Sequence, residues 1–155
     1  MTSTRARASI FVKRFTLTCI ALLGWAASVL SASATIDDAL SFALEAAEPY
    51  VKEGFTVRED YWGGDLAVKQ TKAIVHQLFK GNEYWFWLGT DLDGAKVSVH
   101  IYDSEGNLAE VENKVGKHWA AARILPKKTG SYYLIVEVEK SSKERTTWSL
   151  AYGFR

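Results

Sequence analysis

The feature that most constrains this chain is a series of short segments, from about Phe55 to the C-terminus, in which apolar and polar residues alternate. Alternation with a period of two places one set of side chains on each face of a β-strand, so that one face is buried and the other is solvated. Gly, Asn, Asp and Pro residues mark turns between these segments. The pattern therefore predicts an all-β fold, an antiparallel β-sandwich of about seven or eight strands, rather than an α/β fold.

The clearest predicted strands are the ones in which alternation is longest, at residues 83–90, 95–103, 131–140 and 146–155. Shorter strands are expected at residues 53–60, 72–79, 108–113 and 118–125. The sequence Trp-Gly-Gly-Asp at residues 62–65 predicts a turn, because glycine and aspartate are the usual turn residues.

One segment before the strands has a different period. Apolar residues recur at helical spacing between residue 35 and about residue 50, at Ile36, Leu40, Ala43, Leu44 and Ala47. This spacing predicts one amphipathic helix, which Pro49 is expected to end. We expect the helix either to pack across the β domain or to act as a short docking arm.

The first 34 residues have the pattern of a signal peptide. Four basic residues and no acid come first, an apolar run of about 15 residues follows (16–30), and Ala32 and Ala34 stand at the spacing that signal peptidase requires. The run is shorter than the roughly 20 residues of a membrane-spanning helix. We therefore predict cleavage near Ala34, a mature form that does not span the membrane, and a secreted or periplasmic location. The predicted organisation is a signal peptide at 1–34, a helix at 35–53 and a β-sandwich domain at 54–155.

The composition after residue 34 excludes several classes of protein. Four of the 19 basic residues and none of the 18 acidic ones precede residue 35, so the mature chain is mildly acidic and lacks the basic surface of a nucleic-acid-binding protein. The one cysteine, Cys19, lies in the predicted signal peptide. The mature chain therefore has no disulfide, no thiol nucleophile and no cysteine-ligated metal, and its stability must come from packing.

From about Gly81 onward, the order of motifs resembles the bacterial pre-peptidase C-terminal domain. The motifs are an aromatic strand (84–88), a strand that ends in Tyr-Asp-x-x-Gly (99–106), a Gly-x-Tyr strand (130–136) and a closing aromatic strand (148–152). The resemblance implies a small jelly-roll-like β-sandwich. It also implies a non-catalytic module of exported proteins that is often associated with adhesion to polysaccharide or matrix protein.

Exposed aromatic side chains are the best candidates for a ligand site. In the strand at 83–90, Trp85 and Trp87 point away from Tyr84, Phe86 and Leu88, so one set can line an outer face. The candidate ligand-binding residues that would form a flat stacking platform are Trp85, Trp87, His100, Tyr102 and Tyr133. The alternative is that both sets are buried, one between the sheets and one beneath the helix.

Calcium is the best cofactor candidate that the sequence suggests. Asp91, Asp93 and Asp103, with Glu105, stand in predicted turns at strand ends, and Ca²⁺ prefers clustered carboxylate oxygens. The alternative is that these acids only form the turns.

Catalytic motifs are missing from the sequence. His76, His100 and His118 are the three histidines, and neither a His-Glu-x-x-His motif nor a Gly-x-Ser-x-Gly motif occurs. We therefore predict a non-catalytic binding or adhesion module whose partner is a polysaccharide or an extracellular protein. One alternative is a structural partner of another exported protein that docks through the helix at 35–53, and another is an unrecognised hydrolase.

Overall fold

The computed structural model describes residues 36–155, so the predicted signal peptide lies outside the described residues. Within this range the chain forms a helix over residues 36–52 and nine strands. The strands are β1 (Thr56–Val57), β2 (Trp62–Ala67), β3 (Thr71–Leu78), β4 (Tyr84–Thr90), β5 (Lys96–Tyr102), β6 (Glu112–Val115), β7 (Trp119–Ile124), β8 (Gly130–Lys140) and β9 (Arg145–Phe154). The prediction of antiparallel sheets with one helix is confirmed.

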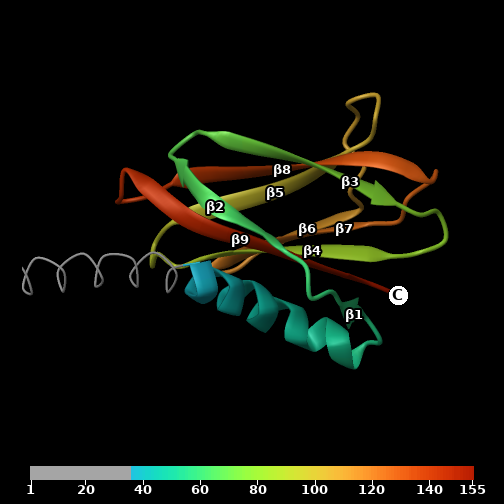
Figure 1. The fold of residues 1–155 in the computed structure, drawn as a ribbon, viewed down its shortest axis with the longest axis horizontal. Coiled ribbons are helices and arrows are strands. Elements are labelled where there is room, and N and C mark those ends of the chain that lie inside the picture. Colours follow the sequence, from blue (N-terminus) through green and yellow to red (C-terminus); the bar gives the residue numbers. More distant parts are fainter. Residues whose placement is uncertain (1–35) are drawn as a thin grey trace, which may run out of the picture. The chain divides into compact units, whose positions relative to one another are not determined.

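The strands form two antiparallel sheets that face each other (Figure 1). The large sheet has the order β1-β9-β4-β7-β6, and β2 pairs with a second part of β9. The small sheet has the order β3-β8-β5. Strands β4 and β5 follow each other in sequence but belong to different sheets, as do β2 and β3, and β8 and β9. The chain therefore crosses repeatedly between the layers.

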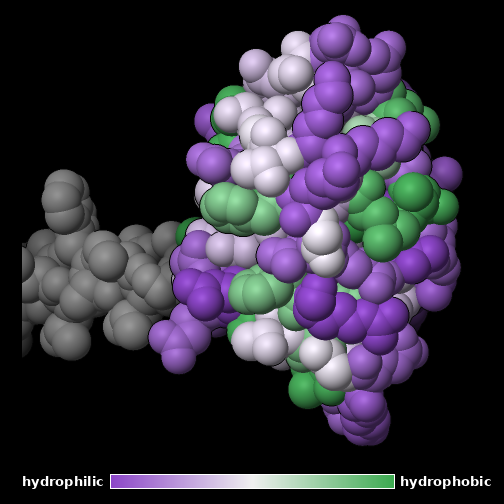
Figure 2. Space-filling model, turned by 90° about the vertical axis from the view of Figure 1, so that its right-hand side faces the viewer, coloured by the Kyte–Doolittle hydropathy of each residue, from purple (hydrophilic) through white to green (hydrophobic). Residues whose placement is uncertain are grey.

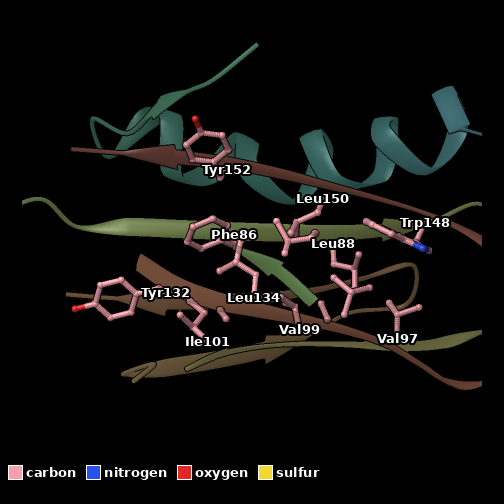
Figure 3. Close-up of a cluster of buried hydrophobic side chains, with 14 of the residues drawn as sticks. Phe86, Leu88, Val97, Val99, Ile101, Tyr132, Leu134, Trp148, Leu150 and Tyr152 are labelled. Atoms are coloured by element: carbon pink, nitrogen blue, oxygen red, sulfur yellow. The ribbon is translucent and has the colours of Figure 1, made fainter. Parts of the chain in front are cut away.

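The interior between the sheets is made of the inward-facing half of each alternating strand. Figure 3 shows these side chains meeting between the two layers, with Phe86 and Leu88 from β4 opposite Leu134 from β8 and Val99 from β5. All four are fully buried. For these inward-facing residues the sequence pattern and the structure agree, because the apolar side chains of an alternating strand all lie on one face.

Three segments differ from the sequence prediction. The strand expected at 53–60 is reduced to the two residues of β1. The predicted turn at 62–65 is wrong, because these residues begin strand β2, in which Gly63 pairs with Ser149 and Gly64 with Trp148. A Cβ atom on Gly64 would lie 3.5 Å from the Trp148 ring. This is ordinary van der Waals contact, so the two glycines are residues of a paired strand and do not change the direction of the chain. The strand expected at 108–113 forms later, as β6, and Leu108 makes only an isolated bridge to Tyr102.

The predicted helix is present and lies on the outer face of the large sheet (Figure 1). Its buried side chains are alanines at helical spacing, Ala39, Ala43, Ala46 and Ala47. The helix continues past Pro49 and ends near Gly54, whose φ of 97° is in the left-handed region that glycine adopts readily. No helix in the described part of the chain has the length and hydropathy needed to cross a bilayer.

Candidate functional site

The structure separates the five predicted ligand-binding residues into two groups. Trp85 and Trp87 lie on the helix side of β4, where they are 2% and 0% exposed. They pack with Ala43, Ala47 and Ala121 in a second buried cluster between the helix and the large sheet. These two side chains therefore have the position that the alternative interpretation assigned to them, beneath the helix.

The other three predicted residues lie together on the outer face of the small sheet. His100 and Tyr102 come from β5, and Tyr133 comes from the neighbouring strand β8. Tyr133 is 38% exposed, and His100 and Tyr102 are half-buried. No helix or strand of the described residues covers this face, as the upper layer of Figure 1 shows. It is therefore the accessible part of the predicted platform.

The strand register extends this platform into a continuous row of apolar side chains. Tyr102 pairs with Tyr133, and Tyr133 pairs with Val75 of β3. On the other side, Leu108 bridges to Tyr102. Residues that pair directly across strands project from the same face, with Cβ atoms about 4.5 to 5.5 Å apart. We call Leu108, Tyr102, Tyr133 and Val75 the exposed row; Leu108 and Val75 are each 59% exposed.

A histidine and a carboxylate stand next to the exposed row. His100 Nδ1 lies 2.9 Å from Glu110 Oε1, and the Glu110 side chain is only 8% exposed. The other oxygen of Glu110 accepts the backbone N–H of Ile101 at 2.9 Å, and Asn113 Nδ2 donates to Oε1 at 3.2 Å. Because an ionised carboxylate can only accept, the contact places the Nδ1 proton of His100 toward Glu110 and fixes the orientation of the ring beside the exposed row.

A groove continues the exposed row toward one end of the sandwich. It has a volume of about 360 Å³, and Leu108, Val111 and Leu125, which line it, are 59%, 52% and 49% exposed. Lys127 and Tyr132 line both this groove and a neighbouring polar hollow of about 310 Å³. Figure 2 looks onto this end of the molecule and shows hydrophobic side chains among a largely hydrophilic surface. Leu108 belongs to both the row and the groove, so the two form one apolar surface.

The four predicted calcium ligands do not come together. Asp91 and Asp93 precede β5, whereas Asp103 and Glu105 follow it, so a strand of seven residues separates the two pairs. At about 3.3 Å per residue, this strand is roughly 20 Å long. Among the described residues, no group of three or more His, Cys, Asp or Glu side chains is placed to hold a metal ion.

Each pair has local contacts of its own. Asp103 Oδ1 accepts the backbone N–H groups of Glu105 and Asn107, both at 2.9 Å. The hydrogen bonds from Asn107 lower the pKa of Asp103 below its usual value. Asp93 lies 3.3 Å from the Lys117 ammonium group. Calcium binding stays a prediction, which a comparison of melting temperatures with and without Ca²⁺ tests.

The three histidines occupy separate places. His100 lies on the open face, while His76 lies beside the rings of Trp62 and Tyr152. His118 stacks on Phe42 of the helix, with the ring centroids 4.2 Å apart. The described residues therefore place no two histidines in one site, and each has a different neighbourhood of aromatic or acidic side chains.

Two members of the exposed row, Leu108 and Val75, were not identified from the sequence. Val75 follows the buried Ile74, so alternation places it on the solvent side of its strand, where a polar residue is expected. An apolar residue on the solvent side of an alternating strand is a signal that can be recognised in a sequence. Its partnership with Tyr133 depends on the strand register, which a single sequence does not reveal.

Comparisons with known proteins give little further information. No protein-family model and no curated protein matches the chain. Among solved structures, the chain is similar to Aeromonas hydrophila PliG, described as a periplasmic lysozyme inhibitor of g-type lysozyme. The two are 15% identical, the match covers 66% of this chain and 90% of that one, and the TM-score is 0.48. This likeness carries no functional argument, and the function is therefore argued from the surface and the sequence of this chain.

Proposed function

We propose that this protein is a non-catalytic binding module that holds a protein partner on the exposed row and the adjoining groove. The observation that supports the proposal is the uncovered outer face of the small sheet. There, tyrosine and aliphatic side chains from four adjacent segments form one surface. Contiguous apolar surface of this kind, bordered by polar residues, is typical of interaction sites.

The composition of the surface favours a protein partner over a polysaccharide. Sugar rings stack on flat aromatic side chains, whereas Leu108, Val75 and Leu125 are aliphatic and offer no flat face. The centre of a protein interface is more apolar than its polar rim and is enriched in tyrosine and other aromatic residues. Charged groups border this surface: Lys127 lines the groove, and Glu137 lies on β8 four residues from Tyr133. Recognition of a polysaccharide is the competing outcome of the experiment below.

The sequence resemblance to pre-peptidase C-terminal domains supports the same class of function. The motifs that carry it correspond to strands β4, β5, β8 and β9, which supply most of the core between the sheets. The strand orders β2-β9-β4-β7 and β3-β8-β5 support the jelly-roll-like connectivity that the resemblance implies. With the predicted signal peptide, we infer that the partner is met outside the cytoplasm.

Docking through the helix receives less support. The apolar side of the helix, with Ala39, Ala43 and Ala47, is already buried against the large sheet of the same chain. A partner that used this side would have to displace the helix and expose Trp85 and Trp87. The open face of the small sheet requires no such rearrangement.

The proposal is tested by site-specific photocrosslinking in the exporting cell. A photoreactive residue at position 133 should give a discrete protein adduct, because Tyr133 lies in the middle of the exposed row. The same residue in place of Glu45, on the exposed side of the helix, is the matched control and should give none. Mass spectrometry of the adduct identifies the partner, and Tyr133→Ser should weaken its binding to the purified protein at least tenfold.

A glycan array with the purified protein decides the competing outcome. Binding to a defined glycan that Tyr133→Ser abolishes, together with equal crosslinking at positions 133 and 45, would replace the protein partner by a polysaccharide.

A further inference from the structure

A separate hollow lies between the two sheets, at the end of the sandwich where β3 ends and β9 finishes. Its volume is about 370 Å³, at the small end of the range for ligand pockets. The side chains that matter for the argument are Arg58, His76, Phe79, Tyr84, Tyr152 and Phe154. The hollow shares no residue with the proposed partner surface, and four of these side chains are phenylalanine or tyrosine.

The walls of the hollow are aromatic rings held by the core. Tyr84 and Phe154 have ring centroids 5.9 Å apart, and His76 and Tyr152 have centroids 4.8 Å apart. Trp62 packs behind both His76 and Tyr152, at 5.1 and 5.4 Å. Rings at these separations present π-faces and edges on which a flat apolar molecule can pack.

The Tyr84 hydroxyl has a proton without an acceptor among the described residues. Its oxygen accepts the backbone N–H of Phe79 at 3.1 Å and the side-chain N–H of Asn82 at 3.1 Å. These two bonds occupy the lone pairs of the oxygen. The hydroxyl can therefore still donate one hydrogen bond, and Tyr84 lines the hollow.

Arg58 places a positive charge at the same hollow. Its backbone N–H donates to the Tyr152 carbonyl at 2.9 Å, which holds the residue beside β9. Its side chain is half exposed, and Nε lies 3.5 Å from Asp60 Oδ1. Asp60 also accepts the Tyr152 hydroxyl at 3.0 Å and does not line the hollow. Asp60 and the Tyr152 hydroxyl therefore engage part of the guanidinium, and the five N–H donors of an arginine side chain leave others available to an anion.

His76 completes the wall as a neutral ring. Burial lowers the pKa of His76, and the opposing effect of Asp60 is smaller. No other residue in the described part of the chain forms a hydrogen bond with it, and aromatic rings surround it. A neutral imidazole in this position can donate or accept a hydrogen bond without adding a second charge.

We propose that this hollow binds a small aromatic carboxylate. The ring of such a molecule matches the aromatic walls, while the carboxylate matches the guanidinium of Arg58, which can donate two parallel hydrogen bonds, and the free proton of Tyr84. A positively charged ligand would be repelled by Arg58, and a ligand without a carboxylate would leave its remaining N–H donors without an acceptor. The site is independent of the protein partner proposed above.

The test uses benzoate as the probe and the tryptophan indole N–H signals in two-dimensional NMR as reporters. Trp62 adjoins His76 and should shift saturably, whereas Trp148, at the opposite end of β9, should not. Benzyl alcohol, which has the ring without the charge, should bind at least tenfold more weakly. Acetate, which has the charge without the ring, should leave Trp62 unchanged at the same concentration.

Two variants separate the charge from the walls. Arg58→Gln should weaken benzoate binding about tenfold, equivalent to about 1.4 kcal/mol, and leave benzyl alcohol unchanged. Lys72→Gln, an exposed change on β3 outside the hollow, is the matched control and should bind benzoate normally. Phe79→Ala, at a side chain 51% exposed and therefore tolerant of change, should weaken both probes alike.

Equal shifts of Trp62 and Trp148 would overturn the proposal, because they would indicate unspecific binding. It would also be overturned by the absence of a Trp62 shift, or by an Arg58→Gln protein that keeps its fold and its benzoate affinity.

Discussion

The outer faces of the two sheets differ in whether another element covers them. On the large sheet, Trp85 and Trp87 are covered by a helix, while on the small sheet Tyr133 and Val75 remain exposed. The difference begins in the strands themselves. β4 is buried at every position, whereas β8 alternates and places Glu137 and Glu139 on its outer side. A strand that is apolar on both faces needs a second layer, and an alternating strand does not.

Charged side chains also form hydrogen bonds and ion pairs at one end of the covered face. Glu83 accepts hydrogen bonds from Arg123 at 2.7 Å and from Arg155 at 2.8 Å. Lys114 lies over the Trp85 ring at 5.2 Å and donates to the Tyr50 hydroxyl at 3.0 Å. These groups surround the edge of the layer between helix and sheet, so the contrast with the open face can be tested residue by residue.

The largest difference should come from truncating one aromatic side chain on each face. Trp87→Ala should lower the free energy of unfolding by about 3 to 5 kcal/mol, because it leaves a cavity beneath the helix. Tyr133→Ala on the open face should cost less than about 1 kcal/mol. Urea denaturation of both variants measures the contrast. Similar losses at the two positions would show that the open face is also part of a core.

The second largest loss of stability should come from adding a side chain beneath the helix. A Cβ atom on Gly89 would lie 2.0 Å from the Ala39 carbonyl oxygen and 2.7 Å from the Ala43 nitrogen. Gly89→Ala should therefore push the helix from the sheet and cost about 3 kcal/mol, the upper range for overpacking. Gly130→Ala is the control, since nothing lies within 4 Å of its Cβ position. A Gly89→Ala protein of normal stability and unchanged near-UV circular dichroism would contradict the close contact.

Acid should weaken the closed end of the covered face. Desolvation raises the pKa of Glu83, but the hydrogen bonds and charges of Arg123 and Arg155 outweigh it, and the net shift is downward from 4.5. A lowered pKa in the folded state means that this stabilisation is complete above pH 4.5 and is lost as the pH falls through the folded value. Glu83→Gln should cost about 1 to 3 kcal/mol at neutral pH.

Stability measured from pH 7 down to pH 3 checks this assignment. The loss in acid should be smaller in Glu83→Gln than in the unchanged protein. Curves that run parallel for the two proteins would assign the acid sensitivity to other carboxylates.

The smallest effect is expected for a conservative change on the open face. Val75→Thr retains the shape of the side chain and exposes a hydroxyl to water, so stability should change by less than about 0.5 kcal/mol. The same substitution at Val99, which is fully buried on the inner face, is the matched control and should be clearly destabilising. A large loss at Val75 would mean that the exposed row contributes to the fold.

Much of the fold could be predicted because alternation reports burial directly. Strands β5, β8 and β9 and the helix follow from periodicity alone. The alternative that placed Trp85 beneath the helix was also available, because an amphipathic helix must bury its apolar side. Strand β2 could not be recognised, since Gly63 and Gly64 are turn residues in most contexts and only their pairing with β9 shows that they belong to a strand.

The candidate site was less accessible to prediction. Tyr102 and Tyr133 were identified as aromatic residues of two strands, but their pairing, and the addition of Leu108 and Val75, depends on register. The same reason explains the acidic residues: Asp93 and Asp103 are ten positions apart in sequence, and the strand between them keeps them at opposite ends of the sheet. Two residues that flank one strand are close in sequence but are held apart in space by the length of that strand.

The position of β9 has a consequence for how the chain acquires its structure. This strand is the last of the described strands in sequence, yet it lies between β4 on one side and β1 and β2 on the other. Thr56, at the sequence start of the strand region, pairs with Phe154 at its end. Neither sheet-to-sheet nor helix-to-sheet packing can be completed before β9 arrives. Pairings between residues far apart in sequence are slow to form, so the domain should fold on the millisecond-to-second scale. Folding can be completed only after β9 has been synthesised.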